Sequence, residues 1–351
     1  MRSLNLKLLA AAVIMMALSG WTYWNSVQQA ERFERGQKFL PNLNPDEIAE
    51  IEIRQADETT ALRRGPEGDR FLITSADGYR ATNSSVNRFI KSVLELALEK
   101  EVGSGGSLHE ELGLMAAGEE GASPETVEIA LRNASGSDMV RFAVGESIEG
   151  GGTYVRRLDG DEETVFLTDR RVFLNTAEDD FVDKEILDLA QSEVQSLEGI
   201  DYRFARAEAG GPLALSDMPA GQKESSQAGQ VKSVLQGLRF TQQFLANDPE
   251  IVDLVFDRQI EVLLEDGSGY VLQSAERGDR HFLRLEGFHT AGRITIAQDA
   301  SDEEVQETSE LLERADELQR FNAFHGSWIY EVTVNTADRV RATRDDLLED
   351  A

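Results

Sequence analysis

His109, in the run His109-Glu110-Glu111, is the one histidine of this chain with carboxylates directly beside it. A helical zinc site of this type needs a second histidine four residues later, because positions i and i+4 share one face of a helix. Position 113 is glycine, and His281, His289 and His325 are scattered, without the ligand spacing of a known metal site. We therefore expect no metal site here and predict a solvated helix start.

Acidic and glycine-rich clusters are the other segments whose residue types suit chemistry. The runs 159–163 and 178–180 hold several carboxylates each, but neither has the terminal bidentate glutamate of a calcium loop, which favours charged hairpin turns. A chain this acidic contains candidate carboxylate pairs for glycoside hydrolysis by chance, so such pairs neither indicate nor exclude a glycosidase. The glycine cluster 103–106 lacks the lysine and serine of a phosphate-binding loop, and the cluster 150–152 leads into an expected strand and not a helix. We therefore predict flexible loops for both.

Composition narrows the function classes further. The 351 residues include no cysteine, which excludes disulfides, thiolate nucleophiles, zinc-thiolate sites and a lipoprotein anchor. The formal net charge of −30, from 35 basic and 65 acidic side chains, repels phosphates, so we expect no nucleic acid partner. Together these patterns predict a protein that is not an enzyme and that has no catalytic residues, no metal and no cofactor.

An apolar run from Leu8 to Leu18 predicts a membrane helix at the amino end. Basic residues precede the run and interfacial aromatic residues follow it: Arg2, Lys7, Trp21, Tyr23 and Trp24. Because positive charge favours the cytoplasmic side, the rest of the chain is expected outside the cytoplasm. A cleaved secretory signal is the alternative, since Ala17, Ser19 and Gly20 suit a cleavage site. Both interpretations export the remaining chain.

The segments after the anchor recur in the same order in two halves of the chain. Both halves open with a short turn or strand start followed by apolar residues in alternation, over 46–53 and over 192–200. A helix is expected next in each half, over 84–97 with a serine cap and over 231–244, and both contain the tetrapeptide Lys-Ser-Val-Leu. This matched order predicts a duplication.

Hairpins follow the helix in each half. Val127–Leu131 and Ile260–Leu264 both precede a polar turn with glycine, which predicts hairpin entries. Two more matched pairs of strands are expected after them: 153–158 with 281–285, and 165–167 with 294–296. Each half therefore reads as strands, a helix and an antiparallel meander.

The second half contains further elements. We expect a polar loop over 207–229 and a strong helix opened by Ser301, with Glu304 at capping-box spacing. The segment 328–334 predicts a strand whose two aromatic residues, Trp328 and Tyr330, belong to the core. A charged tail is expected to end the chain.

These patterns predict an α+β protein with an N-terminal transmembrane helix and a duplicated ectodomain of mostly antiparallel sheets, with helices on one face. The cytoplasmic tip, membrane anchor and juxtamembrane linker occupy residues 1–39. The first α+β repeat is placed at 40–188. The second repeat, with a C-terminal helix and strand, is placed at 189–351.

Short motifs between residues 40 and 189 carry a resemblance to a known family. In chain order they are Leu40-Pro41, Asn44 to Ile48, Leu112-Gly113-Leu114, Gly152 to Val155, and Phe181 to Lys184 followed by Ile186 to Leu189. This series resembles the bacterial domain-of-unknown-function 4340 family over nearly the whole chain. Phe181 stands where that family usually has tryptophan, and 116–123 is a glycine-rich insertion.

The resemblance implies a protein anchored in the bacterial inner membrane, with a periplasmic or extracytoplasmic domain. Members of the family are often encoded beside gliding-motility-type ABC transporter components. The resemblance therefore implies an accessory subunit whose partners are the permease and ATPase subunits of such a transporter. It defines no functional residues.

Three functions stay open on the sequence. The favoured one is a non-catalytic accessory or interaction subunit of an ABC-type transport or envelope complex. The second is a binding module for a soluble or cell-wall ligand held between the two repeats. The third is a carboxylate-dependent hydrolase, which would need two close acids in one cleft.

Overall fold

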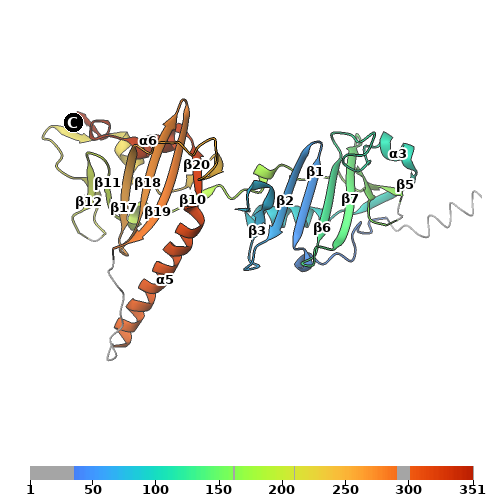
Figure 1. Ribbon diagram of the computed structural model, residues 1–351, viewed down its shortest axis with the longest axis horizontal. Helices are drawn as coiled ribbons and strands as arrows, with labels where there is room; N and C mark the ends of the chain where they lie inside the picture. Colours follow the sequence, from blue (N-terminus) through green and yellow to red (C-terminus); the bar gives the residue numbers. More distant parts are fainter. Residues whose placement is uncertain (1–34, 161–162, 209, 291–300, 351) are drawn as a thin grey trace, which may run out of the picture. The chain divides into compact units, whose positions relative to one another are not determined.

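The computed structural model describes residues 35–160, 163–208, 210–290 and 301–350, and the chain divides into two compact units between Asp183 and Lys184 (Figure 1). The sequence patterns predict this boundary a few residues later, after residue 188. Within the described ranges no helix has the length and apolar character that a membrane span requires. The predicted anchor and its flanking residues Arg2, Lys7, Trp21, Tyr23 and Trp24 lie outside the described residues.

The first unit is built on a nine-stranded sheet of order β4-β3-β2-β1-β6-β7-β8-β9-β5. Its strands are β1 (Glu50–Gln55), β2 (Glu58–Arg64), β3 (Phe71–Ile73), β4 (Tyr79–Arg80), β5 (Leu98–Ser104), β6 (Val127–Arg132), β7 (Asp138–Ser147), β8 (Thr153–Arg157) and β9 (Thr164–Thr168). All neighbouring pairs in this sheet are antiparallel. The helical elements are η1 (Pro45–Glu47), η2 (Thr74–Ala76), α2 (Asn83–Leu94), α3 (Gly106–Glu111) and η3 (Glu178–Asp180).

The first sheet buries side chains on both faces over part of its width. Phe142 of β7 meets Phe39 edge-on, with ring centroids 5.6 Å apart. The next residue, Ala143, points to the opposite face, because side chains alternate along a strand. There it packs with Leu114 and Val165 in a second cluster that Leu108 of α3 helps to cover. The expectation of helices on one face is therefore too simple for this sheet.

Helix α2 begins and ends at residues other than those predicted. Thr82 precedes the helix with extended backbone, and its carbonyl accepts hydrogen bonds from Ser85 and Val86. The serines named as caps thus lie inside the first turn. The helix ends at Leu94 because Leu98 already belongs to β5, which pairs with β9.

The second unit is built on an eight-stranded sheet of order β13-β12-β11-β17-β18-β19-β20-β16. Its strands are β11 (Val194–Glu198), β12 (Arg203–Arg206), β13 (Leu213–Leu215), β16 (Gln242–Leu245), β17 (Arg258–Leu264), β18 (Ser268–Arg277), β19 (Arg280–His289) and β20 (Trp328–Val332). Two small sheets pair β10 (Glu185–Leu187) with β15 (Leu238–Arg239) and β14 (Gln222–Glu224) with β21 (Leu348–Asp350). The helical elements are η4 (Gln191–Glu193), α4 (Ser226–Lys232), α5 (Asp302–His325), α6 (Val334–Arg341) and η5 (Arg344–Leu347).

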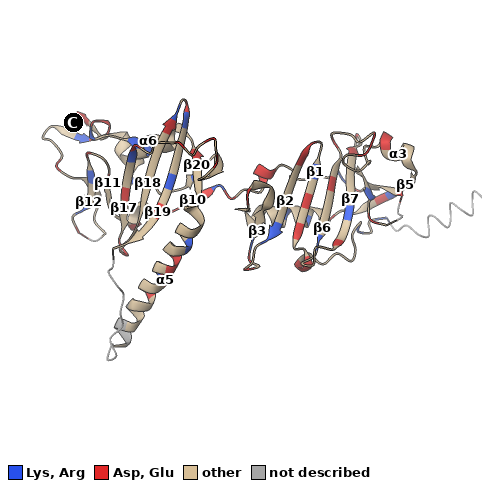
Figure 2. Ribbon diagram, in the orientation of Figure 1, with Lys and Arg blue, Asp and Glu red and all other residues tan. Residues whose placement is uncertain are grey.

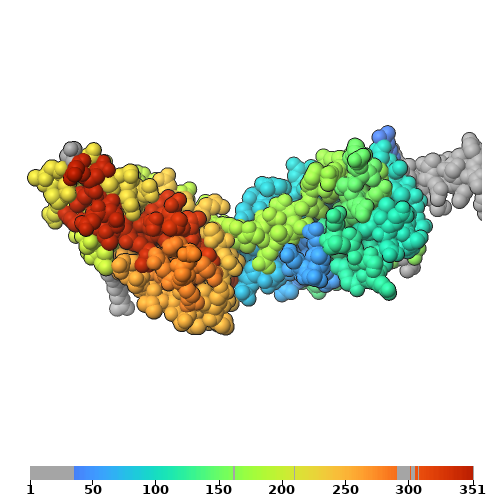
Figure 3. All heavy atoms as spheres, turned by 90° about the horizontal axis from the view of Figure 1, so that it is seen from above, coloured from blue at the N-terminus to red at the C-terminus, as the bar shows by residue number. Residues whose placement is uncertain are grey.

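Helix α6 covers one side of the second sheet. It contacts β17, β18 and β19, and Figure 3 shows the C-terminal residues in red lying over the orange strands. Ala337 and Val340 of this helix are buried, as are Ile260 and Leu272 of the sheet. Helix α5 packs against β19 and β20 instead.

The expected helix over 231–244 is wrong. Helix α4 ends at Lys232, and Gly237 then adopts a left-handed φ of 57° that interrupts any helical path. The following residues form β15 and β16, and Phe240 packs against Tyr330 with ring centroids 5.0 Å apart. Tertiary pairing with β20 therefore outweighs the local helical spacing.

The expected loop over 207–229 is also wrong, and the charged tail contains secondary structure. The loop contains β13, β14 and the start of α4, and the tail contains α6, η5 and β21. The two segments pair with each other, from Gln222 opposite Asp350 to Glu224 opposite Leu348. Short polar strands of this kind form only because a distant segment supplies the ladder, so local patterning does not reveal them.

Several matched segments of the two halves are confirmed. A short 3-10 turn precedes the first strand in both units, η1 before β1 and η4 before β11. The hairpins β6–β7 and β17–β18, helix α5 and strand β20 lie where the sequence predicts them. The expected strand at 294–296 lies outside the described residues. The α+β class with antiparallel sheets is confirmed.

Candidate functional site

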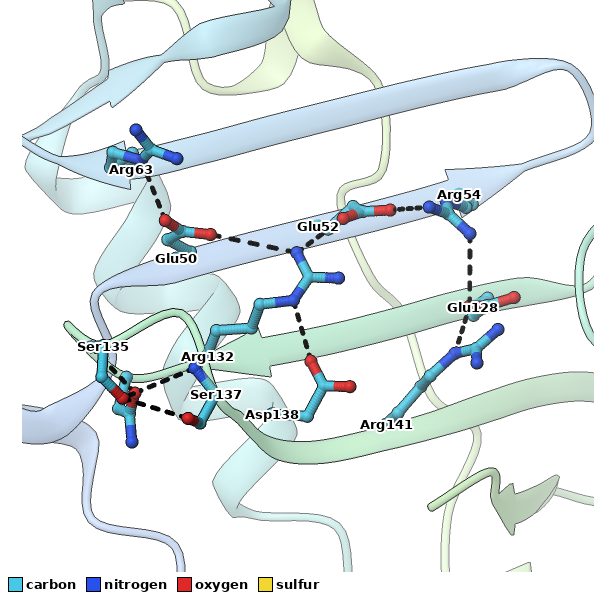
Figure 4. A network of polar contacts seen from close by, with 11 residues as sticks. Glu50, Glu52, Arg54, Arg63, Glu128, Arg132, Ser135, Ser137, Asp138 and Arg141 are labelled. Carbon is cyan, nitrogen blue, oxygen red and sulfur yellow. Dashed lines mark hydrogen bonds and ion pairs between the residues drawn. The ribbon is translucent and has the colours of Figure 1, made fainter.

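A charge ladder crosses β1, β2, β6 and β7 on one face of the first sheet (Figure 4). Its members are Glu50, Glu52, Arg54, Arg63, Glu128, Arg132, Asp138 and Arg141. Each of its four carboxylates has an arginine partner within the ladder. Figure 2 shows acidic and basic residues on these neighbouring strands. The charges cancel, so this face holds strands together rather than offering a free acid or base.

Glu128 is the buried member of the charge ladder. Its side chain is 3% exposed and accepts hydrogen bonds from Arg141 Nε at 2.6 Å and from the Ala117 backbone at 2.9 Å. The hydrogen bond with Glu128 raises the pKa of Arg141, despite the opposing effect of burial. This carboxylate thus links β6, β7 and the loop before β6.

His109 is buried and not part of a solvated helix start, which corrects the sequence interpretation. It is 3% exposed, and its Nε2 lies 2.7 Å from the Glu163 carbonyl. Its Nδ1 lies 3.0 Å from an amino group of Arg156, so Nδ1 is the acceptor and Nε2 carries the proton. Burial lowers the pKa of Arg156. The imidazole therefore serves as a structural acceptor for a partly buried cation.

The glycine cluster 103–106 is not the expected loop. Gly103 and Ser104 pair with β9 as part of β5, and Gly106 begins α3. The cluster 150–152, by contrast, connects β7 to β8.

The acidic clusters have ordinary structural roles. Strands β8 and β9 pair antiparallel on either side of the run 159–163, as expected for a hairpin, although residues 161 and 162 lie outside the described residues. Asp159 pairs with Arg157. The run 178–180 is the 3-10 turn η3 and not a hairpin, because no strand pair flanks it. Within the described ranges no group of three or more histidines and carboxylates is placed to hold a metal ion.

A pocket of about 550 Å³ opens where β19 and β20 separate in the second unit. The two strands pair from His281 opposite Val332 to Leu283 opposite Tyr330, and no further. Continued register would place Leu285 opposite Trp328, and both of these residues line the pocket instead. The volume lies within the range of about 300–1,000 Å³ typical of small-molecule sites.

Two charged residues of β19, Arg284 and Glu286, stand on the rim of this pocket. Arg284 Nε donates to Gln273 Oε1 at 2.5 Å, and Gln273 in turn donates to Gln259 at 3.2 Å. The guanidinium carbon also lies 4.4 Å from the ring centroid of Phe256. The hydrogen bond and the aromatic contact hold the guanidinium group in one place.

An apolar wall closes the other side of the pocket. Ile251 is fully buried in a cluster with Phe244, Phe282 and Ile329, and Leu254 and Phe256 pack against that cluster. Trp328, which is 5% exposed, lies at the opposite margin. The pocket therefore combines an apolar interior with polar groups at its rim.

The C-terminal end of α5 forms the remaining wall. Asn322 Oδ1 accepts the Gly287 N–H at 2.6 Å, and its Nδ2 donates to the Gly287 carbonyl at 2.7 Å. His325 is 2% exposed, and its Nδ1 lies 2.6 Å from the Tyr330 hydroxyl. Phe321 packs over the His325 ring at 4.2 Å. These contacts fix the helix on β19 and β20.

The amino-terminal part of α5 extends beyond the sheet (Figure 1). Arg314 links the helix to the β17–β18 turn through Asp266, at 2.6 Å. We call residues 302–313, before this link, the α5 arm; it is about 18 Å long. Val305 and Leu312 on the arm are 40% and 45% exposed. Figure 2 shows acidic residues along the helix, and Glu310 and Glu313 of the arm are exposed.

Few residues of the pocket can be identified from the sequence alone. Trp328 was expected in the core, which its burial confirms, but the core interpretation gave no sign of a cavity beside it. The apolar run from Ile251 to Phe256 was the available signal, because it is neither a matched strand nor a polar loop. Arg284 and Glu286 follow ordinary strand alternation, so only the separation of β19 from β20 marks them.

The fold and these sites define an α+β protein of two antiparallel units, with a charge ladder in the first and a pocket and projecting helix in the second. A family model described as a domain of unknown function (DUF4340) matches residues 72–254, which is just over half of the chain. The chain belongs to this family, and the resemblance found in the sequence is thereby confirmed. No curated protein and no solved structure matches the chain.

Proposed function

We propose that this protein is a non-catalytic, membrane-anchored extracytoplasmic subunit that binds an ABC-type transport or envelope complex. The α5 arm is the observation that supports this proposal. Val305 and Leu312 of the arm are exposed, and the opposite end of the helix is fixed to β19 by the hydrogen bonds of Asn322. Helices gain most of their stability from packing an apolar face, so an exposed arm of this kind suits docking to another protein.

Charge indicates what kind of partner the α5 arm binds. Glu310, Glu313 and Asp316 are exposed on the same helix, and Asp316 lies one turn after the apolar Leu312 on the same face. Such a surface is repelled by anionic lipid headgroups and attracted by lysine and arginine. The partner is therefore a protein surface with basic residues around an apolar patch.

The test is site-specific photo-crosslinking in native membranes with the full-length chain. A crosslinker at Leu312 is expected to capture a subunit of a membrane complex, and mass spectrometry identifies it. The control position is Ile200, which is 61% exposed at the β11–β12 turn of the same unit. Equal capture from both positions, or none from Leu312, would contradict docking through the arm.

Two variants complete the test. Leu312→Asp and Val305→Asp are expected to abolish co-purification of the complex, whereas Ile200→Asp leaves it intact. Recovery of a permease and an ATPase supports the ABC-type assignment, and recovery of another membrane complex rejects it while retaining the docking role. Deletion of residues 8–18 is expected to release the protein from the membrane, and a deletion variant that stays bound would remove the anchor from the proposal.

A further inference from the structure

The pocket between β19 and β20 offers two opposite charges that the protein leaves unpaired. Among the residues that the structure describes, neither Arg284 nor Glu286 has an ion-pair partner. The two residues also do not pair with each other, although they project from the same face of one strand. Their α-carbons are about 7 Å apart, as alternate residues of a strand are.

Arg284 is prepared to bind a carboxylate. Gln273 occupies its Nε, and Phe256 lies beneath the guanidinium plane, so the two terminal amino groups are left to face solvent. A guanidinium group held in this way loses little conformational freedom when it binds an anion through two parallel hydrogen bonds. Carboxylates match that geometry.

Glu286 restricts the charge of the ligand. A simple anion bound at Arg284 would be repelled by the Glu286 carboxylate two residues along the strand, and a simple cation bound at Glu286 would be repelled by Arg284. A molecule with both charges satisfies both residues at once. The apolar wall of Ile251, Phe256 and Trp328 then favours an apolar body between or beside the charges.

We propose that this pocket binds a zwitterionic amino acid or short peptide with apolar side chains. The ligand's carboxylate lies on Arg284, its ammonium group lies on Glu286, and an apolar side chain lies against Ile251 and Trp328. This inference concerns a site separate from the α5 arm and does not depend on the proposed docking function.

Trp328 supplies the readout. The chain has three tryptophans, and the variant Trp21→Phe/Trp24→Phe leaves Trp328 at the pocket as the single reporter. The full-length variant, in detergent, is titrated with leucyl-leucine, N-acetyl-leucyl-leucine, leucyl-leucinamide and octanoate. Leucyl-leucine is expected to change the Trp328 emission with saturation. The acetylated and amidated forms are expected to bind about tenfold more weakly, because each lacks one charge.

Variants connect each ligand charge to one residue. Arg284→Gln is expected to weaken leucyl-leucine about tenfold and to leave leucyl-leucinamide unchanged. Glu286→Gln is expected to weaken leucyl-leucine about fivefold and to improve binding of the acetylated form. Arg320→Gln, on the exposed surface of α5, is the matched control and changes neither.

The proposal is overturned if octanoate binds more tightly than leucyl-leucine, which would indicate an apolar carboxylate as the ligand. It is also overturned if no dipeptide changes the emission while the ligand-free spectrum of Trp328 shows the residue still buried. Loss of dipeptide binding in Leu312→Asp would contradict the independence of the pocket from the arm. If Leu312→Asp binds leucyl-leucine as the unchanged protein does, the pocket works independently of the arm. A loss of docking in that variant then says nothing against the pocket.

Discussion

Asn322 of α5 takes the place of a strand partner for Gly287 of β19. Its side-chain amide accepts the Gly287 N–H at 2.6 Å and donates to the Gly287 carbonyl at 2.7 Å, as an antiparallel neighbour would. The contact lies beyond the last residue pair of β19 with β20. One side chain thus satisfies a sheet edge that would otherwise be open and fixes the helix at the margin of the pocket.

Replacing Asn322 by alanine is expected to destabilise the second unit by about 1–3 kcal/mol, because the buried Gly287 backbone loses both hydrogen-bond partners. Urea unfolding followed by Trp328 emission, in the background without the other tryptophans, measures this change. Gln319→Ala, at an exposed position of the same helix, is the control and should leave the free energy of unfolding within about 0.5 kcal/mol. Equal effects of the two substitutions would contradict the edge-capping role.

Gly145 is expected to tolerate no side chain. A Cβ at this position would lie 2.3 Å from the Leu112 carbonyl and 2.6 Å from the Gly113 carbonyl, and these are backbone atoms that cannot rotate away. Gly145→Ala should therefore cost about 1–3 kcal/mol in the first unit. Gly106→Ala in α3 meets no atom within 4 Å and should be neutral or stabilising. Thermal unfolding by circular dichroism compares the two, and a neutral Gly145→Ala would refute the close approach.

Within the charge ladder, burial should decide the effect of losing a carboxylate. Glu128→Ala leaves Arg141 and the Ala117 N–H without their acceptor and is expected to cost about 1–3 kcal/mol. Asp138→Ala removes an acid whose side chain is 49% exposed and should cost less than about 1 kcal/mol. Thermal unfolding by circular dichroism measures both. A cost for Asp138→Ala that matches or exceeds that of Glu128→Ala would show that burial does not control this network.

The Asp266–Arg314 link predicts a dependence on pH. Burial acts to raise the pKa of Asp266, but hydrogen bonds from Ser268 and Arg314 outweigh it, so the pKa is lowered. A lowered pKa in the folded state means that the stabilisation is complete above the unfolded pKa of about 3.9 and is lost as the pH falls through the folded value. Asp266→Asn should therefore weaken the second unit at pH 7 by less than about 1 kcal/mol and have a smaller effect below about pH 4.

Urea unfolding at pH 7, 5 and 3.5, followed by Trp328 emission, tests this dependence. Asp279→Asn, at an exposed position of the same unit, is the control. A difference between Asp266→Asn and the unchanged protein that grows as the pH falls would have the wrong sign for this link.

The sequence by itself determined the α+β class, the order of the paired elements and much of the core. Strand alternation in Ile51 and Ile53 already marks which side chains are buried, because a period of two holds wherever one face of a sheet is covered. The 3-10 turns before β1 and β11 and the two hairpins β6–β7 and β17–β18 also follow from local signals, since turn residues and periodicity act over a few positions. The family was identified from motifs of the same local kind.

Where local and distant preferences conflict, only the tertiary structure decided which conformation the chain adopts. The segment after Lys232 has helical spacing but forms strands, because β20 offers a ladder and Tyr330 offers a packing partner for Phe240. His109 became a buried acceptor because Arg156 of a distant strand needs one. The pocket exists because the residues of β20 before Tyr330 do not pair with β19, which brings Arg284 and Glu286 beside an apolar wall from residues 251–256. Such a separation depends on how whole strands diverge in space, and no pattern of neighbouring residues records it.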